Sequence, residues 1–353
     1  MASSIRTLSL TSGQNGRWLV SDFHALFRKL PKVRSLTLTG FHGLPVRQLC
    51  RLAPLFPELN KLDVKYCQLQ AVDEGEEDED QFNKLTSLSF IWTDFSKEAI
   101  QKLLKSLPQL KEANFGANHN RILRANDSAL EALGNHCSHI NHLSVSLQEV
   151  NEASLCSIIA HYGSQLKHLS IRCASSDTLR TVATHATHVE QLVIRSSGDV
   201  TQQTRRQRQQ RTQNEPEEED EEEAVEDNVM GILRHCRGLV RLEMVSWMVQ
   251  DVPWIVWRAM DTVSQRRRKT AMVEQQPSHS RKPHSTTKST SKETMMMVAV
   301  ALRQQNGHSP APRAAFEIAR HERQNTRQTY QKTVALDTEE LQEIRKAFPV
   351  SSN

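Results

Sequence analysis

The chain has 353 residues, a formal net charge of +4 and a hydrophobic content of 37%. This length suits two ordinary domains or one elongated repeat domain with tails, and the low hydrophobic content indicates that part of the chain does not fold. The six cysteines contain no C-x-x-C pair, which argues against a zinc site or a disulfide framework and favours the reducing cytoplasm or nucleus. We expect no signal peptide, because the N-terminal residues have no long apolar core, and no membrane partner, because the longest apolar run, 295–302, is too short to span a bilayer.

The stretch at 59–69, LNKLDVKYCQL, fits the pattern L-x-x-L-x-L-x-x-N/C-x-L, which is the signature of the leucine-rich repeat. Its marked places are filled by Leu59, Leu62, Val64, Cys67 and Leu69. Leu62 and Val64 lie two residues apart on a short strand and therefore point to the same face. One such strand cannot bury its apolar face alone, so the motif is informative only where it recurs at a fixed period.

The core of this motif can be read nine times. Its first positions are Ile5, Val33, Leu59, Leu85, Leu110, Ile140, Leu166, Val189 and Leu239. The first eight are 23 to 30 residues apart, in or close to the period of about 20–29 that is typical of the repeat. Helical stripes such as 99–107, AIQKLLKSL, lie between the motifs. We therefore expect an α/β leucine-rich-repeat solenoid over residues 1–260, a curved stack with parallel strands on its concave face and helices on its convex face.

Two charged stretches interrupt the repeats, and a third follows them. An acidic insertion lies near 73–80, and residues 199–224 contain a basic Arg/Gln run followed by an acidic run. Residues 261–294 are rich in Ser, Thr, Lys, Arg and Gln. Such compositions do not bury a core, so we expect 199–224 to be a disordered insertion and 261–294 a disordered linker. The basic run at 266–269 would suit nuclear import or a polyanion, but solvated disorder is favoured and we expect no nucleic-acid partner.

The tail, 295–353, contains two segments that could fold. Its apolar run predicts a strand at 295–303. Asp337, with Glu340 three residues later, resembles a capping box and predicts a helix at 338–348. We expect the rest of the tail to be disordered.

The histidines could indicate a metal site, since His136, His139 and His142 are evenly spaced. His136, however, falls four residues before the first motif position of its repeat, as do His185 and His235. This place is the end of a helix, where a basic side chain meets the negative end of the helix dipole. The structural interpretation is therefore favoured over metal binding.

The cysteines also occupy recurrent positions of the repeat. Cys67 lies in the turn, while Cys137 and Cys236 each follow a helix-end histidine. The sequence has no Gly-rich phosphate loop, G-x-S-x-G or HExxH motif. We therefore expect no catalytic residues, no metal and no cofactor, and a protein that is not an enzyme. A hydrolase that uses His and Cys is the alternative from a different class.

The informative surface is the side of the strands that faces away from the helices. In the later repeats it carries a strip of basic residues, formed by His142, His168, Arg172, Arg195 and Arg241. Adjacent strands lie about 4.8 Å apart, so these side chains should stack into rows. A generic polar face is the alternative interpretation. If the strip binds a partner, we expect an acidic or phosphorylated protein segment, because arginine meets carboxylates and phosphates with two parallel hydrogen bonds.

The nine motifs, Cys67 in LDVKYCQL, and the phrases NHCSHINHLSV and RHCRGLVRLEM also carry a family resemblance. Over about residues 5–260 the chain resembles F-box/leucine-rich-repeat proteins of the cysteine-containing subclass, particularly fungal ones. The resemblance implies a protein-interaction module that holds substrates for a cullin–RING ubiquitin ligase of the SCF type, with ligase components as further partners. No F-box-like segment of the L-P-x-E-I-L kind precedes Ile5. A free-standing leucine-rich-repeat scaffold or regulatory protein is the alternative.

Deleting Thr201–Glu223 should leave the repeats folded. The cost of closing a loop depends weakly on its length, and this segment has no core-forming pattern. Thermal unfolding checks this, with Leu59→Ala as the control that damages a repeat. A fall in Tm of more than about 5 °C on deletion, which implies more than about 1 kcal/mol in a protein of this size, would show that the segment packs on the repeats.

Overall fold

A computed structural model describes residues 5–12, 26–71, 81–118, 123–173, 175–196, 228–248, 252–274 and 331–347. The chain divides into two compact units, one formed by 1–253 together with 331–353 and the other by 254–330. The insertions expected near 73–80 and at 199–224 lie outside the described residues, as does the strand expected at 295–303.

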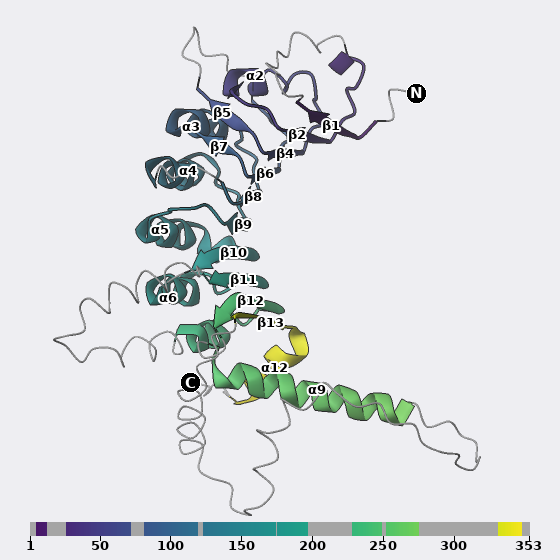
Figure 1. Cartoon of the computed structure of the whole chain (residues 1–353), viewed down its shortest axis with the longest axis vertical. Coiled ribbons are helices and arrows are strands. Elements are labelled where there is room, and N and C mark those ends of the chain that lie inside the picture. The colour runs from purple at the N-terminus through teal and green to yellow at the C-terminus, as the bar shows by residue number, and fades with distance from the viewer. Residues whose placement is uncertain are drawn as a thin grey trace, which may run out of the picture. The chain divides into compact units, whose positions relative to one another are not determined.

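The first unit is built on a ten-stranded sheet in which nine strands run parallel (Figure 1). In sheet order these are β1 (Thr7–Thr11), β2 (Ser35–Thr39), β4 (Lys61–Lys65), β6 (Ser87–Ile91), β8 (Glu112–Phe115), β9 (His142–Val145), β10 (His168–Cys173), β11 (Gln191–Ser196) and β12 (Arg241–Met248). Each begins two residues after the first position of one of the nine motifs. The expected α/β class with parallel strands, one per motif, is confirmed.

Alternate residues of each strand form continuous apolar rows in the core. One row passes from Leu36 through Leu62 to Leu88, and the next passes through Val64 to Phe90. All five of these side chains are buried. The motif residues Leu59, Leu62, Val64, Cys67 and Leu69 are likewise all buried. Each strand therefore completes its apolar surface only by pairing with its neighbours.

Helices form a second layer on one side of this sheet (Figure 1). They are α3 (Lys97–Lys105), α4 (Leu123–His136), α5 (Glu152–Tyr162) and α6 (Ser176–His185), and each contacts the next. In the first repeats the layer contains the short helix α2 (Val46–Cys50) and a small parallel sheet of β3 (Leu44–Pro45), β5 (Gln68–Gln70) and β7 (Asp94–Phe95). A 3-10 turn, η2 (Gly163–Gln165), follows α5.

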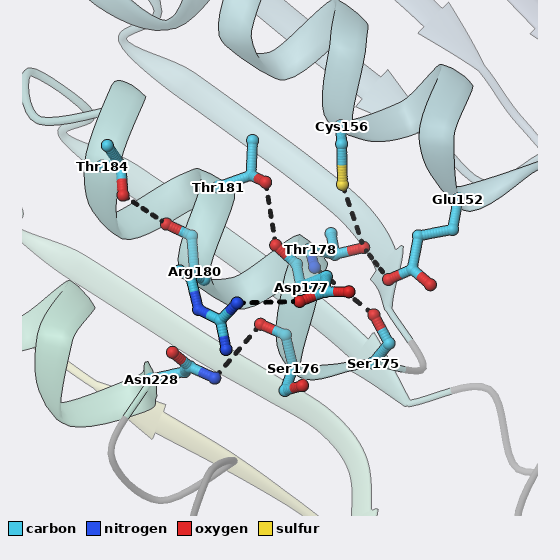
Figure 2. Close-up of polar contacts among 10 residues, drawn as sticks. All are labelled: Glu152, Cys156, Ser175, Ser176, Asp177, Thr178, Arg180, Thr181, Thr184 and Asn228. Carbon is cyan, nitrogen blue, oxygen red and sulfur yellow. Dashed lines mark hydrogen bonds and ion pairs between the residues drawn. The ribbon is translucent and has the colours of Figure 1, made fainter.

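Polar side chains join successive helices where the helices begin (Figure 2). Thr178, which is buried at the start of α6, donates a 2.9 Å hydrogen bond to Glu152 at the start of α5. Ser175 caps α6 by accepting a bond from the Thr178 amide. On the other side, Asn228 donates to the carbonyl of Ser176 at 3.1 Å. These bonds fix neighbouring helices in register, because a polar group buried between helices is costly unless it is paired.

The turn after each strand is closed by a recurrent buried polar side chain. Cys67 Sγ accepts a hydrogen bond from the amide of Phe41, and the Cys67 amide in turn donates to Thr93 Oγ1. In the next repeat, Asn118 Nδ2 donates to Asn126 Oδ1 at 3.0 Å. The bonds of Cys67 reach the neighbouring repeats, and Asn118 Oδ1 also accepts from the Gln148 amide of the following repeat at 3.4 Å, so the turn residue joins repeats as well as closing its own loop.

The last strand of the sheet and the helix after it come from the chain's C-terminal part. β13 (Gln331–Leu336) pairs antiparallel with β12, and α12 (Thr338–Ala347) follows it. The Asp337 amide donates to Glu340, whose own amide donates back to Asp337 Oδ1, which is a capping box. Arg345 Nη2 donates to the carbonyl of Leu239 at 2.8 Å. From the sequence we expected a helix at 338–348, but we did not expect the strand at 331–336.

In the second unit the described residues form one helix, α9 (Trp254–Glu274). The expected disordered linker is therefore wrong over 261–274, while 275–294 lie outside the described residues. The low apolar content of 261–274 does not prevent a helix, because Gln, Arg, Lys, Ala and Met are all good helix formers. Gln265 Nε2 also donates to Asp261 Oδ2 one turn earlier at 2.9 Å, a spacing that supports helices.

Tyr162→Phe should lower the free energy of unfolding by about 1–2 kcal/mol. The Tyr162 hydroxyl lies fully buried, 2.7 Å from the carbonyl oxygens of both Leu133 and Cys137, and the variant removes this donor from both carbonyls. Chemical denaturation measures the loss. Tyr66→Phe is the matched control, since the Tyr66 side chain is exposed and the change should stay within about 0.5 kcal/mol. Equal effects from the two variants would contradict this role.

Candidate functional site

The strand register divides the expected strip into two rows on the sheet face opposite the buried rows. His142 lies beside His168, His168 beside Gln191, and Gln191 beside Arg241. Arg172 lies beside Arg195, four residues further along β10 and β11. We call His142, His168, Arg172, Arg195 and Arg241 the basic strip. Its histidines and Arg241 therefore lie near the amino ends of the strands, and its arginine pair near the carboxyl ends.

The two histidines are in contact. Their rings stack with centroids 5.9 Å apart and an interplanar angle of 17°. His142 Nδ1 lies 2.7 Å from Asn141 Oδ1, and His168 Nδ1 lies 3.3 Å from Gln191 Oε1. Each ring is thus oriented by a neighbouring amide, which leaves its other nitrogen available as a hydrogen-bonding group.

Burial lowers the pKa of His168, and the nearby His142 lowers it further, while the bond to Gln191 and the carboxylates of Glu243 and Glu112 oppose the shift. Because an ordinary histidine pKa is about 6.5, His168 is mostly neutral at pH 7. His168 therefore contributes a hydrogen-bonding group and not a positive charge to the strip near neutral pH.

Arg241 is engaged by a carboxylate of its own strand. Its Nε donates to Glu243 Oε1 at 2.6 Å, and its Nη2 contacts the same oxygen. Glu243 lies two residues along β12, so both side chains face the same side of the sheet. Glu243 therefore partly neutralises the positive charge that we expected at this end of the strip, and Arg241 is less available for a ligand than expected.

Arg172 and Arg195 form the cationic centre of the basic strip. They are directly opposite each other on paired strands, where Cβ atoms are about 5 Å apart and like charges repel. Arg172 is half-buried and Arg195 is exposed. An anion between two such guanidinium groups would relieve the repulsion and could accept paired hydrogen bonds from each.

Ser170 is a candidate that sequence reasoning missed. It lies on β10 between His168 and Arg172 and is 3% exposed, and among the described residues its Oγ is the buried side-chain oxygen or nitrogen that has no hydrogen-bond partner. A buried hydroxyl without a partner is costly, and an oxygen of a bound ligand could supply one. The only signal in the sequence was its place between two residues of the strip.

The expected structural histidines and cysteines lie apart from this face. Among the described residues no group of three or more His, Cys, Asp and Glu side chains is placed to hold a metal ion. The buried Cys236 thiol donates to the carbonyl of Ala186 at 3.3 Å. Burial raises the pKa of Cys137 to about 12 and that of Cys236 to about 11, whereas a nucleophilic cysteine needs a lowered pKa.

His168 should titrate below the ordinary histidine value of about 6.5. Gln191→Ala should lower its pKa further, because the bond to Gln191 favours the charged ring. His142→Gln should raise it, because the variant removes a neighbouring positive charge. NMR titration of the imidazole signals measures all three values. An unshifted wild-type pKa, or shifts of the opposite sign, would contradict the buried environment described for His168.

No protein-family model matches the sequence, and no curated protein matches it. Among solved structures, the chain has a distant similarity to the leucine-rich repeat-containing protein LegL7 from Legionella pneumophila. The two are 12% identical, with a TM-score of 0.34 over 69% of this chain and 84% of that one. No helix in the described ranges is long and apolar enough to cross a membrane.

Proposed function

We propose that this chain is a protein-interaction scaffold that binds a segment of a partner protein on the open face of its sheet, and that its repeats form a curved leucine-rich-repeat solenoid. The nine motifs, each containing the start of a parallel strand, support the repeat assignment. Stacked repeats of this kind present long concave surfaces that bind partners.

The observation that carries the proposal is the arginine pair in register. Arg172 and Arg195 place two permanent charges side by side, with the buried Ser170 hydroxyl two residues from Arg172. This combination of planar donors and a hydroxyl fits an oxyanion, which a protein supplies as a carboxylate or a phosphorylated side chain. An acidic or phosphorylated segment is therefore the partner chemistry we propose, and the strip needs no metal or cofactor for it.

Substrate recognition for an SCF-type cullin–RING ubiquitin ligase is the more specific proposal. Its support is the resemblance of the repeat phrases, such as NHCSHINHLSV, to F-box/leucine-rich-repeat proteins. A free-standing scaffold or regulatory protein is the second candidate, supported by the same binding face without a ligase link. In either case we propose a non-enzymatic protein of the cytoplasm or nucleus, where the free thiols of Cys50, Cys67, Cys137, Cys156 and Cys236 would stay reduced.

The triple variant Arg172→Ala, Arg195→Ala, Arg241→Ala should fold normally, since none of the three side chains lies in the core. It should recover its binding partner about tenfold less well than wild type, a loss of about 1.4 kcal/mol or more if the contacts are buried. Affinity purification with quantitative mass spectrometry measures this. A cullin or its adaptor, recovered equally with wild type and variant, would support the ligase proposal, because in the F-box/leucine-rich-repeat proteins that the chain resembles the F-box and not the repeats docks the adaptor.

The matched control is Arg180→Ala with Arg237→Ala, which removes exposed arginines from α6 and from a turn without touching the strip. Leu59→Ala is the second control and should instead damage a repeat and lower Tm, because Leu59 is buried. If the folded triple variant keeps every partner of wild type, the basic strip is a solvated face. If no cullin or adaptor is recovered with either protein, the free-standing scaffold is favoured.

A further inference from the structure

Two aromatic residues stand in unusual backbone conformations at the carboxyl ends of adjacent strands. Tyr66 directly follows β4 and has φ 53°, and Trp92 directly follows β6 and has φ 50°. The same place after β2 is taken by Gly40, with φ 76°. The amides at this place donate alike to the next repeat, from Gly40 to Lys65 and from Tyr66 to Ile91. Glycine, tyrosine and tryptophan therefore share this left-handed conformation at the same place in three successive repeats.

Glycine adopts a left-handed conformation without steric cost, whereas a bulky aromatic residue is strained there. Burial does not offset the strain at Tyr66, because its side chain is 56% exposed. Trp92 on the neighbouring strand is half-buried. Strained residues cluster at ligand sites, where the strain serves to hold a side chain in place. Exposed tyrosine and tryptophan side chains are also the residue types that most often anchor protein partners.

The aromatic pair and the arginine pair lie along the same edge of the sheet. Lys65 is in register with Ile91, and Arg172 with Arg195, so both pairs lie near the carboxyl ends of their strands. Between them, β8 and β9 are followed by the small residues Gly116 and Ser146. A Cβ atom at Gly116 would lie 2.6 Å from the carbonyl oxygen of Phe90. No larger side chain fits at Gly116, so no bulky side chain stands at this position between the aromatic pair and the arginine pair.

The strand spacing sets the distance between the two pairs. Three strand steps separate β6 from β10, and five separate β4 from β11. At about 4.8 Å per step these are about 14 Å and about 24 Å. An extended peptide rises about 3.3 Å per residue, so it would cover these distances with about four to seven residues.

We propose that the open face reads a bipartite linear segment of a partner protein. A bulky apolar side chain of the segment packs on Tyr66 and Trp92, and an oxyanion side chain, phosphorylated or carboxylate, binds Arg172 and Arg195. The two side chains are about four to seven residues apart. The inference rests on the proposed function and deepens it, because it adds a second subsite and a spacing to the basic strip. Charge complementarity at the arginine pair makes an extended acidic segment the occupant.

Synthetic peptides test this proposal by fluorescence anisotropy. The probes carry Phe and phosphoserine separated by Gly/Ser spacers shorter than, within and longer than the four-to-seven-residue span, and a parallel series carries Glu in place of phosphoserine. Affinity should peak for spacers within that span, and replacing Phe by Gly should weaken binding to wild type about tenfold. The relative affinities of the two series show whether phosphate or carboxylate is preferred.

Tyr66→Gly provides the matched variant. Glycine suits the backbone at this place, so Tm should stay within about 3 °C of wild type. In this variant the Phe-to-Gly change in the peptide should weaken binding clearly less than in wild type, because only Trp92 is left to pack on Phe, while the dependence on phosphoserine is retained. Arg172→Ala with Arg195→Ala should show the reverse pattern.

Two results would overturn the inference, and they differ. If Tyr66→Gly binds every peptide as wild type does while the phosphoserine dependence persists, the aromatic subsite is wrong and the arginine site stands. If wild type shows no dependence on phosphoserine or Glu at any spacing, both the bipartite segment and the proposed oxyanion partner fail.

Discussion

The pairing of one parallel strand per repeat is the interaction on which the rest of the structure depends. Leu62 is buried because Leu36 and Leu88 lie beside it in register on the neighbouring strands. The same register decides which polar residues meet on the other face, because successive side chains of a strand point to opposite sides. A shift by one residue would expose the apolar rows and bury the basic strip, so the core and the composition of the open face are fixed together.

Buried polar groups add a second constraint at the two ends of each repeat. At the turn, Cys67 and Thr93 accept amide hydrogen bonds from the preceding repeat. At the helix end, Cys137 donates weakly to carbonyls of the preceding repeat. Unpaired buried amides and carbonyls are costly, so these positions need small or hydrogen-bonding side chains. This accounts for cysteines that recur in the repeat and carry raised pKa values at the helix ends.

Fewer residues contribute positive charge to the open face than its count of basic residues indicates. Burial leaves His168 mostly neutral, and Glu243 shares the charge of Arg241. Arg172 and Arg195 lie side by side near the carboxyl ends of their strands, two residues from the Ser170 hydroxyl. A small centre of this kind favours one well-placed oxyanion over a broad acidic surface, and affinity for a longer segment then requires contacts elsewhere along the same edge.

The sequence by itself determined the repeating part of the fold, because the strand pattern is local and recurs at a nearly fixed period. It located the start of all nine parallel strands and placed the rows that contain His142 with His168 and Arg172 with Arg195. Only the tertiary structure decided the features that depend on non-local contacts. β13 becomes a strand by pairing with β12, although the two are far apart in the chain. The burial of Ser170 and the left-handed backbone at Tyr66 likewise depend on neighbours that no local pattern identifies.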